Sequence, residues 1–240
     1  MSNNILFIFE GEKEEQRVYK NLTKHFLNKN AIITCAYCST IYDLYQKHKE
    51  DDDLDTFSIL KERKQNANIL KNYVPEDFSE IYMFFDYDGH APIASDDKLK
   101  DLLDTFNNET GKGKLYISYP MIESLKHFSK GVFFKFTNVE CKKNIKYKKL
   151  VNKVCQYRYI DYNQYRKKTW QFILLNHLKK ANFIVSKNYK YPEVLITQKE
   201  IFVNQKVKFI DPSSEVAVLN SFPLFLFEYY GINNFKTLLK

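Results

Sequence analysis

The fold is decided by two stretches, ILFIFEG at residues 5–11 and IYMFFDYD at residues 81–88. Each is an apolar run about as long as a strand buried on both faces of a parallel sheet, and each ends in carboxylates. In an open α/β sheet, the carboxyl ends of the strands border the crevice in which ligands bind. If the two strands are parallel neighbours, Glu10, Asp86 and Asp88 meet there. The sequence therefore predicts an acidic site at one edge of a sheet.

The N-terminal half alternates strand and helix patterns. Strands are expected at residues 5–9, 31–40, 81–86 and 115–118, and helices at 12–27, 43–48, 56–73, 97–106 and 121–128. Such alternation predicts an α/β fold, a Rossmannoid parallel sheet flanked by helices. We expect residues 1–130 to form this domain, with a helical insertion at about 41–78.

Residues 131–240 follow a different pattern and are predicted to form a basic, mainly helical C-terminal region. Helices are expected within residues 144–181 and at 194–209. Residues 216–229 are strongly apolar, and they are expected to be core or, alternatively, the interface of a homo-oligomer.

Composition narrows the class of protein. The chain has 240 residues and is 44% hydrophobic, which argues against global disorder. No run of about 18 apolar residues is present, so no membrane span is expected, and the first residues lack the basic start of a signal peptide. Four cysteines are too few for a disulfide scaffold in a chain of this length. We therefore expect a reduced, cytoplasmic protein. A zinc site is the alternative role for Cys35, Cys38, Cys141 and Cys155, but buried thiols fit their spacing better.

The net charge of +8 is concentrated in one segment. Residues 141–190 hold 14 Lys and Arg and a single acid, Asp161, whereas residues 1–140 hold 18 Lys and Arg against 23 Asp and Glu. An acidic half joined to a basic segment predicts a metal site beside a surface that binds polyanions. The residues expected to contact nucleic acid are Lys142, Lys143, Lys146, Lys148, Lys149, Lys153, Arg158, Arg166, Lys167 and Lys168.

Aromatic residues are interleaved with these cations, at Tyr147, Tyr157, Tyr159, Tyr162, Tyr165 and Trp170. Lys and Arg neutralise phosphates, and aromatic rings can stack on unpaired bases. The alternative is a solvated helix whose tyrosines face the core. A segment of 50 residues with one acid favours nucleic-acid binding.

The carboxylates are spaced for metal binding. Glu10 and Glu14 are four residues apart across a strand-to-helix junction, and Asp86 and Asp88 face the same way while the chain stays extended. Hard oxygen ligands suit Mg²⁺ or Mn²⁺. The alternative is that Glu14 favours the helix dipole and that the two aspartates belong to a turn before Gly89.

Three motifs together resemble a known family. Glu-Gly-x-x-Glu at residues 10–14, followed by Asp-x-Asp at 86–88, resembles the TOPRIM domain of topoisomerases, bacterial primases and OLD-type nucleases. SYPMIE at residues 118–123 resembles a Ser-x-Pro-x-x-Glu element of small standalone TOPRIM proteins of the RloB type, which are linked to phage defence. The resemblance covers residues 5–128. The chain departs from the larger OLD enzymes because it has no P-loop, so a separate ATPase partner is one possibility.

The resemblance implies a TOPRIM-like fold and a Mg²⁺-dependent nuclease that hydrolyses phosphodiester bonds of DNA or RNA, tRNA included, in antiviral defence. It assigns Asp86 and Asp88 as catalytic metal ligands and Glu10 as a ligand or general acid or base. Glu14 and Glu123 would bind a second metal. His90 and His127 are weaker candidates, with surface and partly buried roles as alternatives. Two other functions stay open: a non-catalytic nucleic-acid-binding or regulatory subunit, and primase-like nucleotidyl transfer.

Overall fold

The computed structural model describes residues 4–27, 32–38, 40–51, 53–87, 95–142 and 146–239. These residues form two compact units, each discontinuous in sequence. The first comprises Met1–Phe85 and Asp97–Leu115, and the second comprises Asp86–Asp96 and Tyr116–Lys240.

The strands form a mostly parallel sheet of five, in the order β2-β1-β3-β5-β4. β1 runs parallel to both of its neighbours, and the short β4 pairs antiparallel with β5. The predicted α/β class, with a mostly parallel sheet flanked by helices, is therefore confirmed. The strand bounds are β1 Asn4–Phe9, β2 Ile32–Tyr37, β3 Phe78–Asp86, β4 Asn107–Asn108 and β5 Gly113–Ser118.

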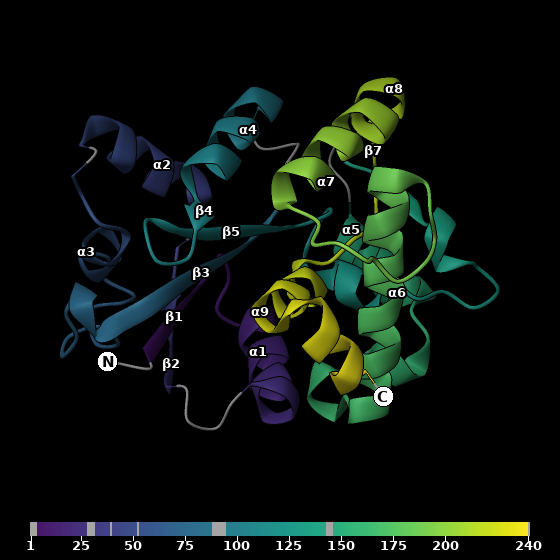
Figure 1. The fold of residues 1–240 in the computed structure, drawn as a ribbon, viewed down its shortest axis with the longest axis horizontal. Coiled ribbons are helices and arrows are strands. Elements are labelled where there is room, and N and C mark those ends of the chain that lie inside the picture. Colours follow the sequence, from purple (N-terminus) through teal and green to yellow (C-terminus); the bar gives the residue numbers. More distant parts are fainter. Residues whose placement is uncertain are drawn as a thin grey trace. The chain divides into compact units, whose positions relative to one another are not determined.

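Apolar side chains on both faces of β1 explain its place between two other strands, β2 and β3. Its residues from Ile5 to Phe9 are all buried. On one face, the ring of Phe7 lies 5.9 Å from that of Tyr82 in β3 and 5.7 Å from that of Tyr19 in α1 (Glu14–Phe26). Helix α1 therefore covers this face. In Figure 1, α2 (Ile41–Glu50) and α4 (Asp96–Thr105) lie above the strands, whereas α1 lies below them.

The helix expected at residues 56–73 is much shorter than predicted. Helix α3 covers only Thr56–Lys61, and turns follow it. The cause is Asn66, whose buried side chain donates to the carbonyl oxygens of Leu60 and Tyr37, both at 3.0 Å, and accepts from the Tyr37 amide at 2.9 Å. An asparagine that bonds to backbone groups in this way competes with helical hydrogen bonds. The apolar pattern gave no sign of this competition.

The second unit is mainly helical. Its helices are α5 Tyr147–Val154, α6 Lys167–Ser186, α7 Gln198–Gln205, α8 Asp211–Ser213 and α9 Ser221–Leu238, with a π-helical turn at Lys206–Ile210. Helix α6 packs against α7 and α9. The sequence did not predict the antiparallel pair β6 (Asn138–Glu140) and β7 (Glu215–Ala217). Among the described residues, no helix is both long and apolar enough to cross a membrane.

Candidate functional site

Glu123 is a carboxylate held inside the second unit. It lies in a 3₁₀ turn, Ile122–Lys126, that follows β5, and it is 2% exposed. Its Oε1 lies 3.1 Å from Nζ of Lys148 on α5. Its Oε2 is buried and has no hydrogen-bond partner among the described residues. Because a buried carboxylate is costly unless its charge and lone pairs are compensated, the second oxygen is an acceptor that a further cation would satisfy.

The turn that carries Glu123 is fixed by Asn220, which is completely buried. The Asn220 side-chain amide donates to the Ile122 carbonyl and to Oγ of Ser124, both at 3.1 Å, and to Oγ of Ser118 at 3.3 Å. Its Oδ1 accepts from the Phe222 amide and caps α9. Sequence reasoning missed Asn220, because its partners lie about a hundred residues earlier in the chain.

Asp86, the last residue of β3, belongs to the same unit and acts electrostatically on the same group as Glu123. That group is the phenol of Tyr147, which is 2% exposed. Burial raises the pKa of Tyr147 well above its ordinary value, and the negative charges of Glu123 and Asp86 raise it further. The Tyr147 hydroxyl therefore stays protonated at neutral pH. Asp88, the second aspartate of the motif, lies outside the described residues, as does His90.

His127 completes the surroundings of Tyr147. Its Nδ1 lies 2.9 Å from the Tyr147 hydroxyl oxygen, and either group can be the donor in this hydrogen bond. Burial lowers the pKa of His127 to about 4, and the positive charge of Lys180 acts in the same direction. His127 is therefore neutral at pH 7. The site thus combines two carboxylates with a neutral phenol–imidazole pair.

Glu10 and Glu14 lie in the first unit. The Glu10 amide donates to the Phe84 carbonyl at 3.3 Å, which places Glu10 directly after the paired part of β1. Glu14 forms an ion pair with Arg17 at 3.2 Å in the first turns of α1. The carboxylate that turns inward is that of Glu15, which is 9% exposed.

Gly11 makes room for Glu15, since a Cβ atom at Gly11 would lie 2.7 Å from Oε2 of Glu15. The charges of Glu12 and Glu15 are among the causes that raise the pKa of Tyr37 at the end of β2, although burial of the phenol is the largest. Sequence spacing identified Glu14 and missed Glu15. The sequence shows the Glu-Gly pair, but only the folded backbone shows that the carboxylate of Glu15 packs against Gly11.

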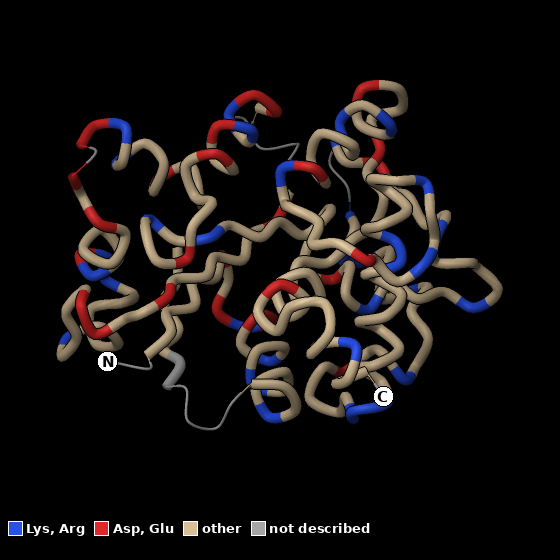
Figure 2. The backbone as a smooth tube through the Cα atoms, in the orientation of Figure 1, with Lys and Arg blue, Asp and Glu red and all other residues tan. Residues whose placement is uncertain are grey.

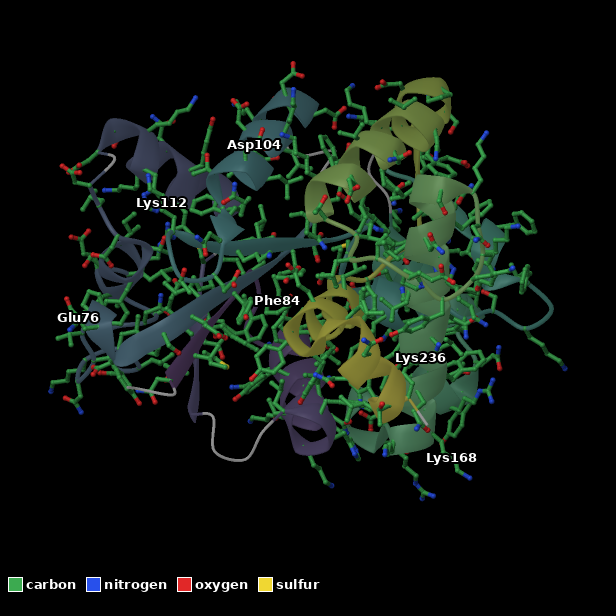
Figure 3. All side chains as sticks on the ribbon, viewed as in Figure 1. Glu76, Phe84, Asp104, Lys112, Lys168 and Lys236 are labelled. Carbon is green, nitrogen blue, oxygen red and sulfur yellow. The ribbon has the colours of Figure 1, made fainter. Side chains whose placement is uncertain are left out.

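Most of the cations predicted to contact nucleic acid are exposed, namely Lys146, Lys149, Lys153, Arg158, Arg166, Lys167 and Lys168. Figure 2 shows the basic residues along α6 without acidic neighbours on that helix, and Figure 3 shows Lys168 projecting from its N-terminal end. Two others have internal partners: Lys148 pairs with Glu123, and Nζ of Lys142 lies 2.8 Å from Oδ2 of Asp96. Lys143 lies outside the described residues.

The aromatic residues between these cations divide sharply by burial. Tyr157 is 88% exposed. The other five are at most 2% exposed, so they are core residues and cannot stack on bases: Tyr147, Tyr159, Tyr162, Tyr165 and Trp170. The alternative that the tyrosines face the core is therefore correct for four of the five tyrosines, and Trp170 is a core residue too.

The cysteines are free thiols. Sγ of Cys141 donates to the Ser214 carbonyl at 3.2 Å and Sγ of Cys155 to the Lys126 carbonyl at 3.0 Å. Burial raises the pKa of both thiols to about 11. Within the described ranges, no three His, Cys, Asp or Glu side chains are grouped so that they could hold a metal ion together.

A separate pocket of about 300 Å³ lies in the first unit. Asp104 and Lys112, both labelled in Figure 3, are among its lining residues, and Tyr45 and Asp101 in its wall are joined by a hydrogen bond of 3.0 Å. None of the residues predicted from the sequence lines this pocket. This pocket therefore does not contain the predicted acidic residues, and the candidate site is the one around Glu123.

Comparisons of the chain with protein-family models, with curated proteins and with solved structures found no match. The functional argument therefore rests on the residues themselves. In the second unit these are a buried carboxylate with one unpartnered oxygen, a second carboxylate that acts on the same phenol, and a nearby run of exposed cations.

Proposed function

We propose that the protein is a metal-dependent nuclease of the TOPRIM type that hydrolyses phosphodiester bonds in DNA or RNA. The observation that carries the proposal is the half-compensated carboxylate of Glu123, buried in the same unit as Asp86. The mostly parallel sheet, with β3 ending in Asp86, agrees with the fold that the proposal requires.

The residues fit a hard divalent cation such as Mg²⁺ or Mn²⁺. Such ions prefer carboxylate oxygens, and Oε2 of Glu123 lacks the partner that a buried anionic oxygen needs. Glu123 and Asp86 would hold the ion, with Asp88 two residues further along the chain. Glu10 belongs to the other unit, so its part in the site rests on the sequence resemblance alone. When bound, the ion would supply positive charge for the phosphate and a more acidic water molecule.

The chain's own groups divide the remaining tasks. The hydroxyl of Tyr147 and the imidazole of His127 are held together at 2.9 Å and stay neutral at pH 7, so they can donate or orient a proton without adding charge beside the carboxylates. The exposed cations of the basic segment, such as Lys149 and Lys153, would hold the phosphate backbone, which makes binding dependent on salt.

A second candidate is a non-catalytic subunit that binds nucleic acid and recruits a separate ATPase. One observation favours it: the Lys148 ammonium group already lies 3.1 Å from Oε1 of Glu123 and supplies part of the positive charge that a metal would bring. In this case the acidic residues would be structural, and the exposed cations alone would carry the function.

Cleavage assays with Glu123→Gln test the proposal, because this change keeps the shape of the side chain and removes its charge. Labelled plasmid, single-stranded DNA and total tRNA would each be incubated with Mg²⁺, Mn²⁺ or EDTA. The exposed Glu193, changed in the same way, is the matched control. The nuclease proposal expects metal-dependent cleavage that Glu123→Gln loses and Glu193→Gln keeps.

Two results would contradict the nuclease proposal. Cleavage that is unchanged in Glu123→Gln would remove Glu123 from the site. Salt-sensitive binding without cleavage in any metal would favour the non-catalytic subunit.

A further inference from the structure

Exposed aromatic side chains gather along one face of α6 in the second unit. Phe172 and Phe183 are eleven residues apart, about three helical turns, so they lie on the same face roughly 16 Å from one another. Phe172 is 42% exposed, whereas Phe183 is half-buried. Beside the C-terminal half of the helix lie Phe133 and Phe136, which are 57% and 64% exposed. Such exposure is unusual for rings that a core could bury, and contiguous exposed apolar surface marks an interaction site.

Ring contacts join the aromatic side chains beside the C-terminal half of α6, whereas the ring of Phe172, nearer the N-terminal end, stacks on that of Tyr159 at 5.8 Å. The Tyr189 ring centroid lies 5.3 Å from that of Phe133 and 6.4 Å from that of Phe183. The ring of Phe136 lies 6.4 Å from that of Phe183. Tyr189 also donates its hydroxyl to Asn176, on the same face of α6 between the two phenylalanines of the helix. We call this surface the aromatic strip: Phe133, Phe136, Phe172, Phe183 and Tyr189.

Two cations lie among the rings of the aromatic strip. The Lys135 ammonium group lies 4.2 Å from the ring centroid of Phe183 and 5.0 Å from that of Phe136. At the other end, the Arg158 guanidinium group lies 5.4 Å from the ring of Phe172. Cations at these distances are attracted to the faces of the rings, and their charges stay beside the exposed aromatic surface.

The charge of the surroundings indicates what covers the strip. Helix α6 contains no Asp or Glu, and no acid occurs between Asp161 and Glu193. A basic surface of this kind is complementary to a polyanion. Rings with interleaved cations suit a polyanion that also offers flat π-faces, and unpaired nucleotides offer both. In a duplex the faces of the bases are already stacked on one another, so they are not available to protein rings.

We propose that the aromatic strip binds single-stranded nucleic acid. Its bases stack on the exposed rings, and its phosphates contact Lys135 and Arg158. This inference rests on the proposed function and narrows its substrate to an unpaired strand or loop. It also moves base stacking from the buried tyrosines of the basic segment to a surface on which Phe133, Phe136 and Phe172 are open to solvent.

Fluorescence anisotropy with three labelled oligonucleotides tests the inference: a short single strand, the same strand in a duplex, and an abasic strand with the same number of phosphates. The wild-type protein should bind the base-bearing single strand at least tenfold more tightly than the abasic strand. Phe133→Leu combined with Phe136→Leu keeps apolar side chains but removes two rings, and should weaken binding of the base-bearing strand roughly tenfold or more. Binding of the abasic strand should stay unchanged.

Two controls keep the test specific to the rings. Phe133→Tyr with Phe136→Tyr keeps the aromatic faces and should preserve binding. Val74→Ala changes a residue of the first unit that is 50% exposed, and should have no effect. Thermal melts of every variant show that it is folded. Equal affinity of the wild-type protein for base-bearing and abasic strands, or full binding by the leucine variant, would overturn the inference.

The test separates this inference from the proposed function. Glu123→Gln should bind the single strand as the wild-type protein does, because Glu123 is not part of the strip. Loss of cleavage with retained binding would therefore leave the strip proposal standing. If the leucine variant keeps metal-dependent cleavage and shows no preference for base-bearing strands, the strip proposal fails and the nuclease proposal stands. A dimer in sedimentation that the leucine variant dissociates would show that a second copy of the chain covers the strip, and would also overturn the inference.

Discussion

Lys148 approaches Glu123 from solvent: its ammonium nitrogen lies 3.1 Å from a carboxylate that is 2% exposed, while its own side chain is 57% exposed. The Lys148 side chain has room in solvent to reorient, whereas the Glu123 carboxylate is enclosed by the protein. This asymmetry makes Lys148 a replaceable partner of Glu123.

Lys148→Ala should therefore destabilise the fold, because it leaves a buried charge without its cation. We expect a loss of about 1–3 kcal/mol in the free energy of unfolding, measured with urea. Lys149→Ala, which removes an exposed neighbour, is the control and should change stability little. If Glu123 is a metal ligand, saturating Mn²⁺ should restore more stability to Lys148→Ala than it adds to the wild-type protein. A loss that Mn²⁺ leaves unchanged would contradict the metal assignment.

Asn220 should matter as much for the site as for the stability of the fold. Asn220→Ala removes the cap of α9 and the buried hydrogen bond to the Ile122 carbonyl, at an expected cost of at least about 2 kcal/mol. Asn220→Asp keeps an acceptor for the cap but loses the amide donor. It should therefore keep the helix, as seen by circular dichroism, while it disturbs the turn that holds Glu123. Wild-type stability in both variants would show that the network is not needed.

His127 should make stability depend on pH between 7 and 5. Its pKa is lowered to about 4 in the folded protein, against an ordinary value of 6.5. The unfolded chain therefore binds the proton first, so stability is complete above about pH 6.5 and falls as the pH drops toward 4. Linkage gives a loss of about 2 kcal/mol from this residue at pH 5.

The change to test is His127→Gln. Urea unfolding at pH 7 and pH 5 should show a smaller difference in the free energy of unfolding for His127→Gln than for the wild-type protein. His177, whose pKa burial lowers to about 3, should account for part of the dependence that is left. An identical pH dependence in the two proteins would refute the assignment.

The exposed cations should set the salt dependence of nucleic-acid binding. Replacing Lys149 and Lys153 by Gln should lower the slope of log K against log salt by about 0.7–0.9 for each phosphate contact that is lost. Lys98→Gln and Lys100→Gln, on α4 of the first unit, are the matched controls. Equal slopes for the α5 and α4 variants would mean that the basic segment does not bind the phosphate backbone of the nucleic acid.

Lys142→Gln should also reduce stability, because Lys142 pairs with the half-buried Asp96.

The sequence predicts the four longer strands, β1, β2, β3 and β5, because apolar runs such as that of β1 are buried on both faces and few other structures explain them. The prediction fails where the hydrogen bonds of a single polar side chain determine where a helix ends. Asn66 ends α3 early through hydrogen bonds to Tyr37 and Leu60, and no periodicity reveals such bonds.

The candidate site shows the same division. Glu123 and Asp86 were identified from motifs, and both act on Tyr147. Their support was not foreseeable, since Asn220 lies about a hundred residues from the turn that it holds. The prediction that these aromatic residues stack on bases was wrong for a related reason. Composition shows that Tyr159 and Trp170 are present among cations, but only packing shows that both are buried.

The hydrogen bonds of Asn220 also order events in time. Proteins emerge from the ribosome N-terminal end first, so β3 and the turn with Glu123 are made long before α9. The turn lacks the hydrogen bonds of Asn220 until this residue has been synthesised and α9, which it caps, has folded. A nascent chain therefore carries the acidic residues without their final arrangement. The turn that holds Glu123 therefore gains the hydrogen bonds of Asn220 only after nearly the whole chain has been made.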